Sequence, residues 1–253
     1  MSDAAGPRPP AFYAAPWRPK RRRWADWWVL LHPPYTLWHL SYVAIGAAIA
    51  SRFDVGRLAA TLLAFLLAVG VCAHALDELH GRPLRTTIPS WLLVGAAAGS
   101  LAGAVALGVI GLTRVGPGLA VFIAVGVALT LGYNLELLGG RLHTDVIFAA
   151  AWGAFPVLTA YYAQVETLRV PALLAAGAAF WLSTAQRSLS TPARMLRRRV
   201  AELDGTITFH DGRRASLSVP DLLAPLEHAL KATAWGVTAL AVALVVFRIT
   251  LDP

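Results

Sequence analysis

Residues able to carry acid–base or metal chemistry gather in two short stretches of this otherwise apolar chain. They are His74, Asp77, Glu78 and His80 in AHALDELHGR, and Glu136, His143 and Asp145 in YNLELLGGRLHTD. Each stretch lies at the end of a long apolar run. A charged group at membrane depth is costly, so it usually faces a cavity or a binding site. The two stretches therefore form the first candidate for a functional site.

The spacing of the first stretch favours metal or acid–base chemistry. His74, Asp77 and Glu78 stand at positions i, i+3 and i+4, and share one face if the helix continues past them. A histidine and a carboxylate so placed can share a divalent cation, and adjacent carboxylates can hold Mg²⁺ through water. The alternative interpretation is a polar helix end in water, with Asp77 paired to Arg82 or Arg85.

Composition predicts the fold class. Hydrophobic residues make up 57% of the chain and charged residues 14%. Apolar runs near the roughly 20 residues of a spanning helix recur along the chain. They cover residues 35–50, 58–76, 88–112, 119–138, 146–162, 170–185 and 229–247. We predict an all-α, polytopic membrane helix bundle with about seven transmembrane helices.

The distribution of lysine and arginine predicts the orientation. With the N-terminus in the cytoplasm, 17 of the 22 Lys and Arg residues lie on the cytoplasmic side. This is the asymmetry of the positive-inside rule, and it predicts a protein integral to the cytoplasmic (inner) membrane. The net charge of +8 is then explained by topology and by anionic membrane lipids, and no nucleic-acid partner is expected.

The same pattern predicts the domain organisation. Residues 1–28 form a basic, Pro-rich cytoplasmic tail, and residues 29–253 a single transmembrane helical domain. A cytoplasmic loop at about 187–227 contains two β-prone runs around Asp211-Gly212, which favour a small hairpin. Three polar stretches, 74–85, 133–145 and 186–199, fall on the cytoplasmic side. We therefore expect their side chains to meet at one mouth of the bundle.

The segments HPPYTLWHLSYVAIGAAIA, HALDELHGRPLRTTIPSW and YNLELLGGRLHTDVIFAAAWGAFPVLTAYYA resemble the UbiA-type intramembrane prenyltransferase family over about residues 30–200. In that family the second span ends in an Asn-Asp-x-x-Asp-x-x-x-Asp motif, and an Arg-Pro turn follows. Here Asp77 resembles the middle aspartate, while His74 and Gly81 occupy the flanking acidic positions. Residues 85–90 resemble the turn.

The resemblance implies transfer of an isoprenoid group from a prenyl diphosphate to an acceptor, with Mg²⁺ as the cofactor. The substrate is expected in a cytoplasm-facing cavity, and prenyl diphosphate or another isoprenoid lipid is the expected partner. The implied roles are catalysis by Asp77, Glu78 and Glu136, metal binding by Asp77 and His74, and substrate binding by His74, Arg82, Arg85, Tyr133, Asn134, Arg187 and Arg194.

The chain also departs from the family. The expected second aspartate motif reads STAQRSLSTPARMLRRR, without an acid between Gln186 and Arg199, and the family usually has nine spans. Arg187, Arg194 or Arg197 could hold a diphosphate directly, because guanidinium groups suit phosphate oxygens. The alternative is that these arginines only mark a cytoplasmic loop.

Two further function classes remain open. One is a metal-dependent intramembrane enzyme whose ligands are His74, Asp77, His80, Glu136 and His143. The other is a non-catalytic lipid-binding or assembly protein of the same fold, which the missing second motif favours.

We predict that cysteines at Arg52 or Arg114 are labelled from the periplasm, and cysteines at Arg85 or Arg198 from the cytoplasm, because the Lys and Arg count is so uneven. The measurement is labelling of intact cells with a membrane-impermeant thiol reagent. The native chain, whose one cysteine is Cys72, is the unlabelled control. The reverse pattern would overturn the topology.

Overall fold

The structure is a computed structural model that describes residues 11–13 and 23–251. Its elements are almost all helices. In chain order they are α1 (Arg23–Leu30), α2 (Pro33–Ala48), α3 (Val55–Phe65), the π-helical segment η1 (Leu66–Ala73), α4 (His74–Leu79), α5 (Ser90–Val115), α6 (Leu119–Asn134), α7 (Asp145–Ala149), the π-helical segment η2 (Ala150–Ala154), α8 (Phe155–Val165), α9 (Val170–Arg198), strands β1 (Gly205–Thr208) and β2 (Arg214–Leu217), and α10 (Val219–Leu251).

The described chain is mostly helical, as predicted, and it is consistent with a membrane bundle. Each of the seven apolar runs lies largely within a helix, and α3, η1 and α4 form one continuous helix. Within residues 11–13 and 23–251, four helices are long and apolar enough to cross a membrane: Val55–Leu79, Ser90–Val115, Asp145–Val165 and Val219–Leu251. The helix α6 is apolar but has only 16 residues, and the number of spans therefore stays a prediction.

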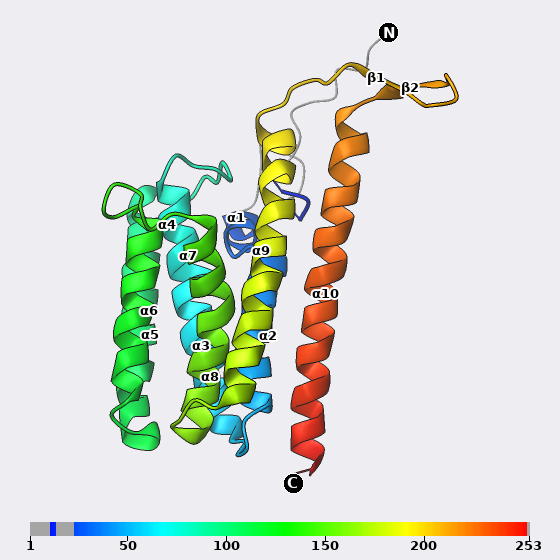
Figure 1. Cartoon of the computed structure of the whole chain (residues 1–253). Coiled ribbons are helices and arrows are strands. Elements are labelled where there is room, and N and C mark those ends of the chain that lie inside the picture. The colour runs from blue at the N-terminus through cyan, green and yellow to red at the C-terminus, as the bar shows by residue number, and fades with distance from the viewer. Residues whose placement is uncertain (1–10, 14–22, 252–253) are drawn as a thin grey trace.

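The long helices stand side by side and alternate in direction (Figure 1). α5 and α6 lie at one edge of the bundle and α10 at the other. The connections after α4, α6 and α9 lie at the upper end of the view, and we name this end after Asp77. The other end is named after Arg57, at the start of α3. Three polar stretches of the sequence therefore meet at the Asp77 end, as predicted.

Two glycines bring the central helices into backbone contact. A Cβ on Gly46 of α2 would lie 2.4 Å from the carbonyl oxygen of Val157 on α8. A Cβ on Gly153 would lie 2.6 Å from both the carbonyl oxygen of Ala179 and the Oγ of Ser183 on α9. Small residues allow this close approach between membrane helices. The contacts fix α2, α8 and α9 as the centre of the bundle.

Two π-helical segments interrupt the helices beside this centre. η1 directly precedes His74, and η2 contains Trp152. The Trp152 carbonyl oxygen accepts a hydrogen bond of 2.8 Å from Nδ1 of the buried His39 on α2. Segments of this kind free backbone carbonyls and often occur at functional sites.

One connection differs from the expected boundary. The sequence placed residues 135–138 in the fourth apolar run, but α6 ends at Asn134, and Glu136 and Leu138 adopt left-handed backbone conformations in the loop. The second long helix ends with α4 at Leu79, so it contains His74, Asp77 and Glu78 but not His80. The hairpin is confirmed: β1 pairs antiparallel with β2, with Thr206 opposite Ser216.

We predict that Gly153→Ala destabilises the bundle by about 1–3 kcal/mol, because the added methyl group overlaps the Ala179 carbonyl and overpacks the α8–α9 contact. The thermal midpoint in detergent should fall by several degrees. Gly99→Ala is the matched control: it has open space around the new Cβ and should be neutral or slightly stabilising. Equal midpoints for the two variants would contradict the packing argument.

Candidate functional site

His74 and Asp77 lie one turn apart on α4 and begin the site. His74 Nδ1 donates a 3.1 Å hydrogen bond to the carbonyl oxygen of Gly70 in η1. Its ring stacks on that of His32, with the ring centroids 4.4 Å apart. His32 directly precedes α2, so this contact joins the start of α2 to the end of the second long helix.

Asp77 lies near the α9 arginines. Arg194 and Arg187 act on its carboxylate electrostatically, and His143 and His80 are the histidines close enough to do so. Within the described part of the chain, no hydrogen bond or ion pair within 4.0 Å involves its carboxylate. Asp77 therefore lies within the field of the α9 arginines without being neutralised by a direct contact.

Tyr133 at the end of α6 closes another side of the same region. Its ring stacks on His143 with a centroid separation of 4.3 Å, and His143 Nδ1 donates to the Tyr133 carbonyl oxygen. Tyr133 is 4% exposed, and within the described residues its buried Oη has no hydrogen-bond partner. Burying a hydroxyl without a partner costs about 1–3 kcal/mol, so this atom points to a missing ligand.

α9 supplies the positive charge. Arg187 pairs with Asp145 at 2.7 Å, and Arg197 holds Glu227 on α10 through two bonds of 2.6 Å. Arg194 differs, because it is half-buried and its one direct side-chain bond within residues 23–251 is to Thr191 of its own helix, at 3.3 Å. A half-buried guanidinium that lacks a carboxylate contact is suited to an anionic ligand.

The N-terminal segment Ala11–Tyr13 covers this region. Tyr13 Oη lies 2.5 Å from His32 Nδ1, and the Phe12 ring lies 4.9 Å from Lys231 Nζ. A cavity of about 40 Å³ remains beneath the segment, with His32, Arg194 and Arg198 among its lining residues. That space holds about one water molecule.

Burial lowers the pKa of His32 well below its usual value, and burial raises the pKa of Tyr13 well above its usual value. Both groups are therefore neutral near pH 7, and the hydrogen bond between Tyr13 Oη and His32 Nδ1 joins two uncharged side chains. The covering segment adds no negative charge, so the arginines keep the site electropositive.

Glu78, predicted to be catalytic, is fully buried and holds a loop. Its carboxylate accepts hydrogen bonds from Leu84 N, Thr86 N and Thr86 Oγ1, at 2.9, 2.9 and 2.8 Å. Asp26 on α1 holds the same loop by accepting from Thr87 N and Thr87 Oγ1. Glu78 therefore does not share the exposed face of His74 and Asp77, because its carboxylate turns beneath the 80–89 connection.

The remaining predicted residues lie around the site. Arg82 donates to the Ile88 carbonyl oxygen and to Ser90 Oγ, and Arg85 is exposed. Asn134 is buried, and its Nδ2 donates to the Thr130 carbonyl oxygen of its own helix. Glu136 is exposed in the loop after α6. Electrostatic interactions thus link Asp77 with Tyr133, Arg187 and Arg194. His74 lies one turn before Asp77, and Glu136 is exposed in its loop.

The predicted magnesium site lacks a set of converging donors. Within residues 11–13 and 23–251, no group of three or more His, Cys, Asp or Glu side chains could hold a metal ion. The groups that act on Asp77 are arginines and histidines, not carboxylates, and the neighbour of the His74 ring is another imidazole, His32. Mg²⁺ prefers oxygen ligands, so the side chains present do not fit an ion held by the protein alone.

Sequence reasoning missed His32, Tyr35 and the covering segment. A histidine directly before a helix that starts with Pro33 is a usable signal for His32. Ala11–Tyr13 carried no signal beyond two aromatic residues in a Pro-rich tail. Trp24 and Trp28 are exposed on α1, as is typical of tryptophan at a membrane interface.

No protein-family model, curated protein or solved structure matches the chain. The resemblance to the UbiA-type family therefore stays a prediction.

We predict that Glu78→Gln loosens the 80–89 connection, because the amide brings a donor to a position surrounded by three donors and leaves at least one unsatisfied. The expected loss is about 1–3 kcal/mol. Faster limited trypsin cleavage after the exposed Arg85 would report it. Glu136→Gln, on an exposed carboxylate, is the matched control and should leave cleavage unchanged. Slow cleavage of both variants would show that Glu78 does not hold the loop.

Proposed function

We propose that this protein binds the diphosphate group of an isoprenoid lipid at the Asp77 end of the bundle and acts as a divergent UbiA-like prenyltransferase. Two available donors support the proposal. Tyr133 Oη is buried without a partner in the described chain, and Arg194 has a bond to Thr191 but no carboxylate contact there. Both residues interact electrostatically with Asp77, which supports a shared site.

A diphosphate fits the chemistry of these donors. Guanidinium groups donate paired hydrogen bonds to phosphate oxygens, and such charge-assisted bonds are about twice as strong as neutral ones. Arg194 and Arg187 supply the positive charge, and Tyr133 supplies a hydroxyl donor. The apolar interior of the bundle suits an isoprenoid chain but not a free, water-soluble phosphate compound.

In the proposed reaction the allylic carbon–oxygen bond breaks, and its electron pair stays on the diphosphate leaving group. The arginines stabilise the charge that develops there, which is the effect of preorganised donors in a site that excludes water. The allylic cation alkylates the acceptor, and the acceptor loses a proton. Asp77 is the carboxylate placed to receive that proton and to balance the charge of Arg194.

The side chains do not fit a magnesium ion held by protein donors alone, so no step of the proposal uses one. In its place α9 carries arginines where the resembled family carries its second aspartate motif. A cavity of about 40 Å³ is too small for a diphosphate. Asp77, Tyr133 and Arg187 do not line this cavity, so a ligand that reaches Arg194 through it must displace Ala11–Tyr13.

A second candidate function is binding of the same lipid without a reaction. It is favoured by the scarcity of free carboxylates at the site. Asp145 and Glu227 are paired to arginines of α9, and the Glu78 carboxylate accepts hydrogen bonds from the 80–89 connection. Within the described residues this leaves Asp77 as the one acid available for chemistry at this place.

We predict that Arg194→Gln weakens binding of radiolabelled geranylgeranyl diphosphate, measured in nanodiscs, by about 10- to 150-fold, the value of a hydrogen bond to a charged group. Tyr133→Phe should weaken binding by about 3- to 10-fold, the value of a neutral hydrogen bond. Arg141→Gln removes an exposed loop arginine and should have no effect. The absence of any binding to the native protein would reject both candidate functions.

Asp77→Asn separates the two candidates. We expect this variant still to bind the prenyl diphosphate. Its rate of diphosphate release, assayed with a membrane lipid extract as the acceptor pool, should fall by more than about 10²-fold. Its thermal midpoint should stay near that of the native protein, because no direct contact of Asp77 is lost. Binding without any diphosphate release by the native protein would favour the non-catalytic candidate.

A further inference from the structure

A second cavity lies away from the candidate site. It has a volume of about 600 Å³ and lies between α3, α5, α6 and α8. Along the continuous helix Val55–Leu79 its lining runs from Gly56 to Val69, so it occupies the Arg57 half of the bundle. Its volume is within the range of ligand pockets in proteins.

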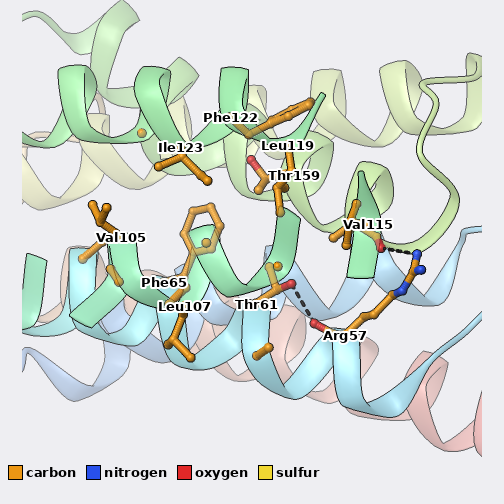
Figure 2. A pocket seen from close by; sticks show the side chains of 18 of the residues that line it. Arg57, Thr61, Phe65, Val105, Leu107, Val115, Leu119, Phe122, Ile123 and Thr159 are labelled. Carbon is orange, nitrogen blue, oxygen red and sulfur yellow. Dashed lines mark hydrogen bonds between the residues drawn. The ribbon is translucent and has the colours of Figure 1, made fainter. Parts of the chain in front are cut away.

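The walls of this cavity are apolar. Phe65, Val105, Leu119 and Ile123 point into the space from three helices (Figure 2). Two threonines of the wall donate within their own helices: Thr61 Oγ1 to the Arg57 carbonyl oxygen at 2.7 Å and Thr159 Oγ1 to the Phe155 carbonyl oxygen at 2.8 Å. The cavity therefore offers hydrocarbon contacts and few free donors or acceptors, which suits an apolar chain.

A polar frame closes one end of the cavity. Arg57 donates to the carbonyl oxygens of Ala163, Gln164 and Arg114, at 3.0, 3.1 and 2.5 Å. The backbone of Asp54 and the side chain of the buried Gln164 exchange two hydrogen bonds, at 2.7 and 3.1 Å. These bonds join the start of α3 to the ends of α5 and α8, so the frame is rigid.

The cavity opens between α3 and α5. Among its lining residues, Gly56 and Ala60 on α3 and Ile110 and Arg114 on α5 are exposed. Glycine and alanine leave a gap there that a larger residue would fill. Because the apolar faces of α3 and α5 belong to helices long enough to cross a membrane, this gap opens toward hydrocarbon.

The rim of the cavity is positive. Arg52 and Arg114 are exposed beside the opening, whereas the Arg57 guanidinium is already bonded to backbone carbonyls and lies 3.4 Å from Glu166. Asp54 also uses its carboxylate, which accepts from Arg57 N at the start of α3. The two exposed arginines are therefore the charges available to a headgroup.

We propose that this cavity is a binding site for the hydrocarbon chain of an anionic membrane lipid, whose headgroup lies against Arg52 and Arg114. The apolar wall, the opening toward hydrocarbon and the two exposed rim cations each match one part of such a molecule. The site is separate from the Asp77 mouth and does not depend on the function proposed there. The residues 57 and 77 of one continuous helix are about 30 Å apart at 1.5 Å per residue.

The test uses phosphatidylglycerol with a diazirine in the middle of one acyl chain, incorporated in nanodiscs and activated by light. Mass spectrometry then locates the label along α6. We expect the label on Phe122 and Ile123, which face the cavity, as well as on Val121 and Val125, which are exposed on the outer face. Label confined to Val121 and Val125 would overturn the proposal.

Two cavity-filling variants sharpen the test. Ala104→Phe fills the space from α5 and Gly126→Leu from α6, and either should lower the label on Phe122 and Ile123 at least about fivefold. Ala106→Phe adds the same side chain to an exposed position outside the cavity lining of α5, and is the matched control. If both filling variants fold and the label on Phe122 and Ile123 does not decrease in either, the proposed site is rejected.

The charge of the lipid is tested with phosphatidylcholine that carries the same photoreactive chain. Phosphatidylglycerol should label the wall more strongly, and Arg114→Gln should reduce that preference about fivefold, the effect of one arginine near an anionic membrane surface. Arg194→Gln, at the other end of the bundle, should change nothing. Equal labelling by both lipids would remove the headgroup part of the proposal.

Discussion

Hydrocarbon offers no hydrogen bonds, so every polar group within this bundle must find its partner in the protein. Most buried polar groups obey this constraint by holding the chain together. Glu78 collects three donors of one loop, His39 caps the carbonyl freed by η2, and Arg57 collects the carbonyls at the ends of two helices. Exceptions are therefore informative. Tyr133 Oη lacks a partner within the described chain, and it lies where the polar stretches of the sequence converge.

The helix Val55–Leu79 connects the two places where a ligand is expected. Its start contributes Arg57 to the closed end of the apolar cavity, and its end contributes His74 and Asp77 to the electropositive mouth. The π-helical segment between them changes the helical phase, so residues on the two sides face different neighbours. One helix can thereby serve two separate sites without enlarging the bundle.

The class of the fold and the end of the bundle that holds the site could be predicted, because both follow from strong patterns. Apolar runs define membrane helices, and alternation places His74, Asp77 and Arg194 at one end. The roles of single carboxylates could not be predicted. Glu78 and Asp77 are neighbours in sequence, but a rotation of about 100° per residue turns one under the loop and the other toward α9. Glu136 follows an apolar run that is typical of a membrane helix. In the structure α6 ends at Asn134, and Glu136 and Leu138 adopt left-handed conformations in the loop that follows.

An anion that binds at the Asp77 mouth must displace the covering segment Ala11–Tyr13. Its affinity is therefore the difference between its own bonds to the arginines and the contacts that the segment loses. Phe12 and Tyr13 contribute ring contacts worth about 0.5–1.5 kcal/mol each, and the contact of Phe12 with Lys231 adds about 0.5–2 kcal/mol. An anion that takes the place of the segment gains charge-assisted bonds of about 1.5–3 kcal/mol each from the arginines. At the middle of these ranges, two such bonds exceed the contribution of the segment and one does not. A ligand with several anionic oxygens can therefore open the mouth, whereas a ligand with a single acceptor leaves it covered.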